Sequence, residues 1–398
     1  MKKYLLFFLF VLPLSFIGQR SSFATDGDID NQNFPTETVI AEPDTLTADE
    51  LLAQKRLSWF FANRYRNDHF NGSVLVAHNG KIVFQQHYGY ADIRARKKLN
   101  DELPFELASV SKTFTSAAVL KLVAAGKLQF DDTVANIVPD FPYKKITIRH
   151  LLSHRSGLQD YVFMDKRYIS YKGSYMTNQE VADIFSKRKL ALLFATDTRF
   201  HYSNSNYALL AHIVAKISGQ RFQTYVRDSI FIPLDMQHSF VFDFTDSLQP
   251  LKAQSHDSLG RKLGDTYRDG VVGDKGIFST TMDMIKWDNA LRNGKVLTLE
   301  MLDEAYTPRS FERVSFGDCK SRNYGYGWRL ANHADGKNIV YHNGWWHGNN
   351  NVFARNMSDN TTIIVLGNRL NNGNYYIDPI WTILKPLKVA DKLLLAQQ

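Results

Sequence analysis

Residues 105–127 read Phe-Glu-Leu-Ala-Ser-Val-Ser-Lys-Thr-Phe-Thr-Ser-Ala-Ala-Val-Leu-Lys-Leu-Val-Ala-Ala-Gly-Lys, and the rest of the chain is organised around this stretch. Apolar residues recur along it at helical spacing, and a glycine near its end is a natural helix stop. Nearly all the other positions are small or apolar, which predicts a helix buried on most of its faces. Ser109 and Lys112 stand three positions apart and therefore share one face of this helix.

The pairing of Ser109 with Lys112 points to nucleophilic chemistry. A serine hydroxyl is a weak nucleophile until a neighbouring base takes its proton. A desolvated lysine can lose its own proton and become that base. The spacing alone is not specific, because a second Ser-x-x-Lys copy occurs at Ser186 and Lys189 within a charged run. The expected burial of the helix favours Ser109 as the nucleophile and Lys112 as its base.

The chain begins with a basic start and a short apolar core at residues 4–17, followed by small residues at positions 22 and 24. This pattern predicts a signal peptide, residues 1–24, that is cleaved on export. A retained membrane anchor is the alternative, but the apolar run is shorter than the ~20 residues that span a bilayer and contains Pro13. We therefore expect a periplasmic or secreted protein with no stable membrane span after cleavage.

Cysteine usage limits the covalent chemistry of the chain. The one cysteine is Cys319, which lies far from the apolar core. An internal disulfide is therefore excluded, and so is lipid attachment directly after the apolar core. A chain of 398 residues is long enough to bury a large core without such a cross-link.

Every charged side chain in residues 25–50 is acidic, which predicts a flexible acidic tether. The whole chain carries a formal net charge of +8, so the remainder is strongly basic. A basic balance suits an anionic cell-envelope polymer, although ordinary surface solubility is the simpler explanation. No recognisable nucleic-acid-binding motif accompanies the charge, so we expect no nucleic-acid partner.

Strand patterns occur near both ends of the chain. Residues 73–77 and 81–87 are rich in Val, Ile and Phe, and they are joined through Asn79 and Gly80. This is a hairpin signal, because an Asn-Gly pair tolerates the positive φ of a type I′ turn. The later strand patterns lie at residues 338–342, 350–354 and 361–366.

The middle of the chain is mostly helical, with helices expected at residues 177–185 and about 206–217. We therefore expect an α/β (α+β) fold in which both chain ends form one antiparallel sheet and residues 110–270 form a mostly helical lobe. We count one catalytic unit, residues 51–390, followed by a C-terminal tail, residues 391–398. A cleft between the lobes is the natural place for a site.

Tyr202-Ser203-Asn204 stands immediately before an expected helix and is a second candidate for the site. A phenol in this position can exchange protons with a nucleophile or a leaving group, and an amide can bind a substrate carbonyl. The alternative is that Asn204 simply caps its helix.

His342-Asn343-Gly344 closes a late strand and is a third candidate. Glycine allows a substrate backbone to approach closely, and a strand edge supplies N–H groups for a carbonyl. The alternative is that His342 is structural, which is the more common role of a lone histidine at the end of a strand.

The order of these three motifs and the residues around them narrow the interpretation. The chain also has His-Leu-Leu-Ser-His-Arg-Ser-Gly-Leu at residues 150–158, Gly-Asp-Lys-Gly-Ile-Phe-Ser-Thr at 273–280 and Tyr-Gly-Tyr-Gly-Trp at 324–328. Over about residues 55–390 it resembles the penicillin-recognising serine hydrolases. Specifically, it resembles the branch that contains class C β-lactamases, D-alanyl-D-alanine carboxypeptidases, D-aminopeptidases and related esterases. The resemblance implies a β-lactamase/transpeptidase-like fold, and it is much less specific for a substrate.

The resemblance also implies roles for individual residues. Ser109 would be the acylated serine and Lys112 its proton acceptor. Tyr202 would protonate the leaving group and help to activate the deacylating water. Asn204 would bind the substrate amide.

The strand motif implies substrate contacts and also shows two departures. His342 and Gly344 would lie along the substrate, and the backbone N–H groups of Ser109 and Trp345 would form an oxyanion hole, with donors commonly worth about 3 kcal/mol each. His342 stands where the β-lactamases of this branch have lysine, and Asn343 stands where they have threonine. The cation and the hydroxyl that hold a substrate carboxylate are therefore missing from this strand. Efficient β-lactam hydrolysis is not expected.

Other patterns in the sequence carry less information. His150 and His154 are four apart, but no third metal ligand accompanies them, so we expect neither a metal nor a cofactor. Trp345 and Trp346 fit either an aromatic-lined subsite or simple packing. Tyr324 is more typical of the core than of a cleft. There is no Gly-x-Ser-x-Gly elbow and no phosphate loop.

Together these patterns predict an exported serine hydrolase that works through an acyl-enzyme on a small-molecule or peptide substrate. A D-amino-acid peptide or amide, of the kind derived from cell walls, is the leading substrate, and a small ester comes next. The alternatives are a carboxylesterase, a weak β-lactamase, and a catalytically idle penicillin-binding or scaffold protein. Intact Ser109, Lys112 and Tyr202 argue against an idle protein, because an inactive site has no chemical use for all three.

Overall fold

The computed structural model describes most of the chain after residue 45. The expected signal peptide, most of the acidic tether and the C-terminal tail lie outside the described residues. Within the described part, no helix combines the length and the apolar character that a bilayer crossing needs. The described residues are 46–164, 174–247, 250–310, 319–333, 336–385 and 387.

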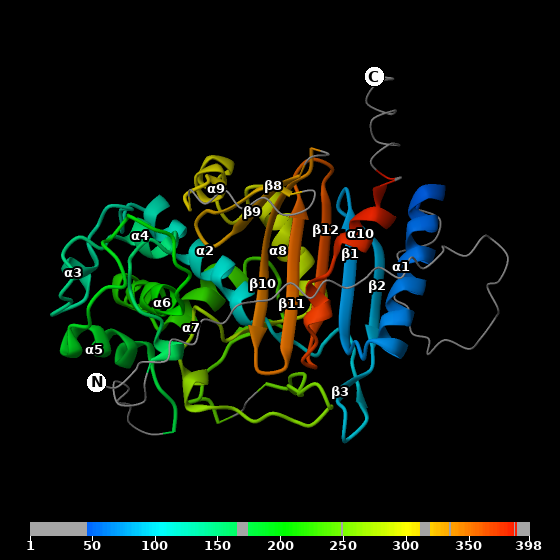
Figure 1. Ribbon diagram of the computed structural model, residues 1–398, viewed down its shortest axis with the longest axis horizontal. Helices are drawn as coiled ribbons and strands as arrows, with labels where there is room; N and C mark the ends of the chain where they lie inside the picture. Colours follow the sequence, from blue (N-terminus) through cyan, green and yellow to red (C-terminus); the bar gives the residue numbers. More distant parts are fainter. Residues whose placement is uncertain are drawn as a thin grey trace, which may run out of the picture. The chain divides into compact units, whose positions relative to one another are not determined.

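A seven-stranded antiparallel sheet forms the centre of the described unit, with strand order β2-β1-β12-β11-β10-β9-β8. In Figure 1 the early blue strands β1 and β2 lie beside the late orange strands β10 to β12. This confirms the prediction that both chain ends build one sheet. The strands are β1 (Gly72–His78), β2 (Lys81–Tyr88), β8 (Cys319–Tyr324), β9 (Arg329–His333), β10 (Asn338–Trp346), β11 (Asn349–Asn356) and β12 (Thr361–Gly367).

The sheet is covered on both faces, and this explains why β1 and β12 are buried along their whole length. Successive side chains of β1 alternate between two separate cores: Leu75 packs in the core shared with the helical middle, whereas Val74 and Val76 pack in the core under the terminal helices. The turn between β1 and β2 has positive φ at both Asn79 (50°) and Gly80 (79°), as the hairpin signal predicts.

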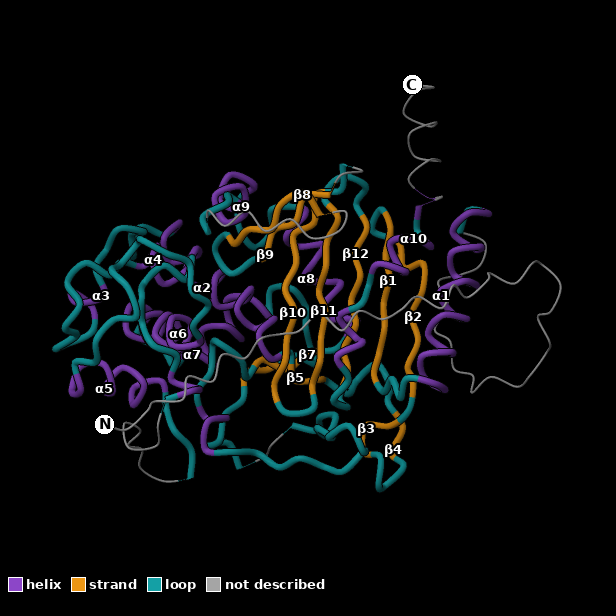
Figure 2. The backbone as a smooth tube through the Cα atoms, in the orientation of Figure 1, coloured by secondary structure: helices purple, strands orange, loops and turns teal. Residues whose placement is uncertain are grey.

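Helices α2 to α7 gather beside the sheet, as Figure 2 shows in purple, which confirms the predicted helical lobe. Helices α1 and α10 contact each other, and α1 also contacts β2; α8 contacts β1 and β12. The helices are α1 (Ala48–Asn67), α2 (Ser111–Ala124), α3 (Val134–Ile137), α4 (Ile148–Leu152), α5 (Asn178–Arg188), α6 (Asn204–Ser218), α7 (Phe222–Val226), α8 (Thr281–Arg292), α9 (Leu299–Tyr306) and α10 (Asp378–Ile383).

The first helix corrects the expected end of the acidic tether. Helix α1 begins at Ala48, within residues 25–50, and the expected boundary at residue 51 is therefore wrong. Thr47 Oγ1 accepts a hydrogen bond from the Glu50 N–H (3.2 Å), and the Glu50 carboxylate accepts one from the Thr47 N–H (2.7 Å). Glu50 therefore serves the start of the helix, and Asp49 lies in its first turn, where the helix dipole favours negative charge. Both residues also match the acidic composition expected of a tether.

Short elements connect the sheet to the helical lobe near the predicted nucleophile. The chain leaves β5 (Phe105–Glu106), passes through the 3₁₀ turn η2 (Ala108–Val110), and enters α2. Strand β5 pairs with β7 (Ile277–Ser279), and β10 packs against η2. The nucleophile turn is thus held between the large sheet and the lobe.

Candidate active site

Ser109 lies on a tight turn between a strand and a buried helix. The preceding residue, Ala108, has a φ of 50°, a left-handed conformation that a residue with a Cβ atom adopts only at a cost of about 1–3 kcal/mol. Ala108 and Val110 are buried, whereas Ser109 is half-buried. The strained turn therefore presents the serine hydroxyl at an accessible position.

Lys112 is fully buried one helical turn after Ser109. Its Nζ lies 3.0 Å from Ser109 Oγ, 2.9 Å from Asn204 Oδ1 and 2.7 Å from the backbone oxygen of Asp274. A neutral amine has two N–H groups and one lone pair. The oxygens of Asn204 and Asp274 match the two N–H groups, which leaves the lone pair for the proton of the serine hydroxyl. This arrangement can withdraw that proton.

Tyr202 packs beside the same lysine. Lys112 Nζ lies 5.0 Å from the centroid of the Tyr202 ring. The centroid of the His154 ring lies 4.4 Å from that of Tyr202, and the two ring planes are tilted by 38°. Tyr202 is half-buried, and among the described residues no hydrogen bond fixes its hydroxyl. The phenol is therefore available to a group that enters the site, as its predicted role requires.

Asn204 is the first residue of α6, and it does not act as the cap of its own helix. Its Oδ1 faces Lys112, whereas its backbone N–H and its Nδ2 both donate to Asp160 Oδ2, at 3.0 and 2.8 Å. The structure thus brings Ser109, Lys112 and Asn204 into one hydrogen-bonded group. Their catalytic roles remain predictions.

His342 is almost completely buried on β10. Its Nδ1 lies 2.7 Å from the Asn343 backbone oxygen and its Nε2 lies 3.1 Å from the Tyr324 hydroxyl, so the hydrogen-bond partners assign the proton to Nδ1. Burial lowers the pKa of His342 well below its usual value, and the nearby Arg329 and Lys112 cations lower it further. His342 is therefore neutral and does not supply the positive charge of the lysine that it replaces.

Gly344 lies where β10 meets the nucleophile turn. A Cβ atom added at this position would stand 2.2 Å from the backbone oxygen of Leu107, so no side chain fits. The next residue, Trp345, is 61% exposed, whereas Trp346 is half-buried and donates its indole N–H to Asp269. The Trp345 indole N–H donates to the His347 backbone oxygen at 3.1 Å, so it is the exposed ring surface of Trp345 that a ligand can contact.

The sequence analysis did not assign three polar residues to the site that the structure places there. Asp160 binds Asn204, and Tyr324, which is buried as expected, donates to His342. The third is Arg329, whose guanidinium carbon lies 5.3 Å from the Tyr202 ring centroid and 6.0 Å from that of Tyr324. The backbone of Arg329 pairs with β8 and β10, but its guanidinium group has no hydrogen bond or ion pair with any described residue. Its place directly after the Tyr-Gly-Tyr-Gly-Trp run was the only sequence signal for it.

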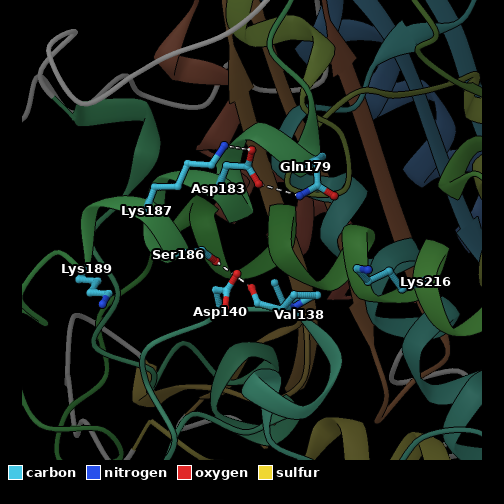
Figure 3. A pocket seen from close by; sticks show the side chains of 9 residues that line it. Val138, Asp140, Gln179, Asp183, Ser186, Lys187, Lys189 and Lys216 are labelled. Atoms are coloured by element: carbon cyan, nitrogen blue, oxygen red, sulfur yellow. Dashed lines mark hydrogen bonds and ion pairs between the residues drawn. The ribbon is translucent and has the colours of Figure 1, made fainter.

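The second Ser-x-x-Lys copy does not form a site. Ser186 donates to the backbone oxygen of Pro139 at 3.3 Å, and Lys189 ends α5 in a left-handed conformation with a φ of 47°. Figure 3 shows both side chains at the edge of a polar surface pocket, where Lys189 does not point toward Ser186. The pairing at Ser109 therefore depends on the buried helix and not on the spacing alone.

The two histidines of the 150–158 segment have separate contacts. His150 completes a capping box with Thr147, and His154 packs against Tyr202. Within the residues that the structure describes, no three side chains of the His, Cys, Asp or Glu type are placed to hold a metal ion.

Comparisons with known proteins agree with this architecture. Penicillin-binding protein 4* of Bacillus subtilis (strain 168) is 31% identical over 337 residues, which cover 81% of this chain and 73% of that protein. The crystal structure of a penicillin-binding protein from Bacillus halodurans matches with a TM-score of 0.70 and 26% identity, over 82% of this chain and 98% of the other.

A third similarity concerns the fold alone. D-Amino acid amidase from Ochrobactrum anthropi SV3 matches with a TM-score of 0.68 and 24% identity, over 87% of this chain and 100% of the amidase chain. The family model described as Beta-lactamase matches residues 61–385. The resemblance drawn from the three motifs is thereby confirmed, and the chain belongs to the Beta-lactamase family.

Proposed function

We propose that this protein is an exported serine hydrolase that acts through an acyl-enzyme at Ser109 on a D-amino-acid peptide or amide. The observation that carries the proposal is the placement of the Lys112 amine 3.0 Å from Ser109 Oγ, with two further oxygens to receive its N–H groups. Family membership supports the same chemistry, because relatives include proteins described as penicillin-binding protein and D-amino acid amidase.

The reaction divides into two steps. Lys112 accepts the hydroxyl proton while Ser109 Oγ bonds to the substrate carbonyl carbon, the bond to the leaving nitrogen breaks, and Tyr202 delivers a proton to that nitrogen. Water then attacks the serine ester and gives one proton to Tyr202, the ester bond to Oγ breaks, and Lys112 returns its proton to the serine oxygen. One amide bond and one water are consumed for each acid and amine released.

Arg329 favours a substrate with a free C-terminal carboxylate. The strand motif has no fixed cation, since His342 is neutral, but Arg329 places a cation beside the ring of Tyr202. A guanidinium group without a partner is suited to a carboxylate. This favours peptides that end in a free carboxylate, whereas the neutral His342 and Asn343 favour the second candidate, a carboxylesterase for small neutral esters.

A substrate panel tests the proposed function. The purified chain is assayed with an N-acyl-D-alanyl-D-alanine peptide, its L-stereoisomer, a nitrophenyl ester and nitrocefin, with Ser109→Ala as the control. We expect turnover of the D-peptide above the L-peptide, slow nitrocefin hydrolysis, and loss of all turnover in Ser109→Ala. Ester hydrolysis without peptide hydrolysis would select the carboxylesterase, and equal rates for wild type and Ser109→Ala would overturn the proposal.

Export is tested separately. We expect the mature N-terminus at residue 25 when the full chain is expressed in a bacterium and the periplasmic or secreted fraction is sequenced. Recovery of a chain that still carries residues 1–24 in the membrane fraction would contradict this part of the proposal.

A further inference from the structure

The loop that precedes η3 (Tyr161–Phe163) is bound tightly to the start of α6. Ser205 Oγ accepts the Tyr161 N–H at 2.8 Å and donates to the Gln159 backbone oxygen at 2.7 Å. Asp160, between them, accepts the Val162 N–H on Oδ1 at 3.0 Å. The loop is therefore fixed by hydrogen bonds on both sides of Asp160.

Asp160 sets the orientation of the Asn204 amide. Its Oδ2 accepts both the backbone N–H and the Nδ2 of Asn204. A carboxylate only accepts hydrogen bonds, so the NH₂ end of the amide must face Asp160 and the oxygen must face Lys112. The reversed amide would place oxygen against carboxylate and N–H groups against the lysine amine. One N–H of Nδ2 is left for a substrate carbonyl.

Asp160 makes one more hydrogen bond to Asn204 than a structural cap of α6 requires. Capping the helix requires an acceptor for the backbone N–H alone, and such caps are worth about 1 kcal/mol. The second bond, to the side-chain amide, contributes orientation. Burial raises the pKa of the Asp160 carboxyl, and the N–H groups of Asn204 and Val162 oppose this by stabilising the carboxylate.

Tyr161, the residue after Asp160, contacts Asp274, whose backbone oxygen is the second acceptor of the Lys112 amine. The backbone oxygen of Asp274 receives Lys112 Nζ, and the Asp274 carboxylate accepts the hydroxyl of Tyr161 at 2.9 Å. The Tyr161 hydroxyl in turn accepts from Lys275 Nζ at 2.8 Å. Asp274, Lys275 and Tyr161 are all buried, so these contacts are shielded from water.

We propose that Asp160 and Tyr161 are a pair of positioning residues, each of which holds one of the two oxygens that orient the Lys112 amine toward Ser109. Asp160 acts through the amide of Asn204, and Tyr161 acts through Asp274. The inference rests on the proposed function in that Lys112 is taken as the base for Ser109. Neither residue touches the substrate.

The two arms of the pair make different predictions in a double-mutant cycle. Asp160→Asn keeps the size of the side chain but replaces one carboxylate oxygen with an NH₂ group, so the side chain cannot accept from both Val162 and Asn204 as Asp160 does. We expect it to lower kcat/KM for the nitrophenyl ester roughly 10- to 100-fold, the range typical of a residue that orients a functional side chain by a hydrogen bond. In an Asn204→Ala background it should cause no further loss. Tyr161→Phe should lower kcat/KM in both backgrounds, because it acts through Asp274.

A matched control separates positioning from stability. Asp257 also accepts two backbone N–H groups, from Leu259 and Arg261, together with the Arg261 Nε, but it lies outside the site. Asp257→Asn should lower the melting temperature with less than a twofold change in kcat/KM. If Asp160→Asn behaves in the same way, or if its effect multiplies fully with that of Asn204→Ala, the proposal is overturned.

A crystal structure of Asp160→Asn gives a readout that does not depend on activity. We expect the Asn204 amide oxygen to leave hydrogen-bonding distance of Lys112 Nζ, and an unchanged contact would contradict the proposal. The two hypotheses can fail separately. A wild-type protein that hydrolyses nothing on the panel contradicts the proposed function, whereas an active wild type with a fully active, ordered Asp160→Asn variant contradicts only the positioning role.

Discussion

Lys112 Nζ lies 3.0 Å from Ser109 Oγ, and Lys112 has no exposed surface. A buried amine without a carboxylate among its three hydrogen-bond partners is suited to exchange a proton, because none of its contacts needs a fixed positive charge. The three contacts go to a hydroxyl, a side-chain amide and a backbone carbonyl.

Replacement of Lys112 removes the proposed base. We expect Lys112→Ala to lower kcat/KM for an ester about 10²- to 10⁴-fold, the usual contribution of general base catalysis. Initial rates measure this, and circular dichroism establishes that the variant is folded. Ester hydrolysis near the wild-type rate in a folded variant would exclude Lys112 as the base.

Tyr202→Phe tests the proposed acid. The substitution removes one hydroxyl and keeps the ring that packs against His154. We expect a fall in kcat of about 10²-fold or more for a peptide, whose amine must be protonated as it leaves, and a smaller fall for a nitrophenyl ester, whose leaving group is stable as an anion. Equal losses on both substrates would show that the phenol does not protonate the leaving group.

Arg329→Ala tests the preference for a terminal carboxylate. We expect KM to rise at least about tenfold, or about 1.4 kcal/mol, for a peptide with a free C-terminus and to change little for its C-terminal amide. Arg227→Ala is the control, because Arg227 is an exposed arginine paired with Asp228. A rise of the same size for both peptides would indicate that Arg329 only supports the ring of Tyr202.

Glu106 predicts how stability depends on pH. Burial, and then the charge of Asp269, raises the pKa of the Glu106 carboxyl to about 7 from its usual 4.5. The folded state therefore holds a proton that the unfolded state has released, and stability falls as pH rises from about 4.5 to about 7, by up to about 3 kcal/mol. Urea unfolding at pH 5 and pH 8 should show that Glu106→Gln is less sensitive to pH than wild type. An unchanged pH dependence would contradict this effect.

Much of the fold could be predicted because its signals are local. The hairpin depends on Asn79 and Gly80, and α5 depends on Thr177, whose hydroxyl accepts the N–H of Glu180 at 3.2 Å. The helix after Ser109 could be predicted because its burial leaves a repeating apolar pattern. In each case, residues that are only a few positions apart in the sequence determine the structure.

Other parts could not be predicted because they depend on contacts far apart in the sequence. Asp160 and Asn204 are 44 residues apart, and nothing in the sequence around Asp160 indicates that it binds an amide. Strand β9, which begins at Arg329, is short and partly polar, so it lacks the apolar run that marked β10 to β12. The position of the Arg329 guanidinium beside the Tyr202 ring depends on the pairing of β9 in the sheet, which no local pattern indicates.

The most direct measurement is the intact mass of the protein after treatment with a fluorophosphonate, which reacts with activated serines. The wild-type chain should gain one phosphonyl group, with the label on Ser109 after proteolysis, and Ser109→Ala should gain none. Labelling of wild type and Ser109→Ala to the same extent would contradict the assignment of Ser109 as the nucleophile.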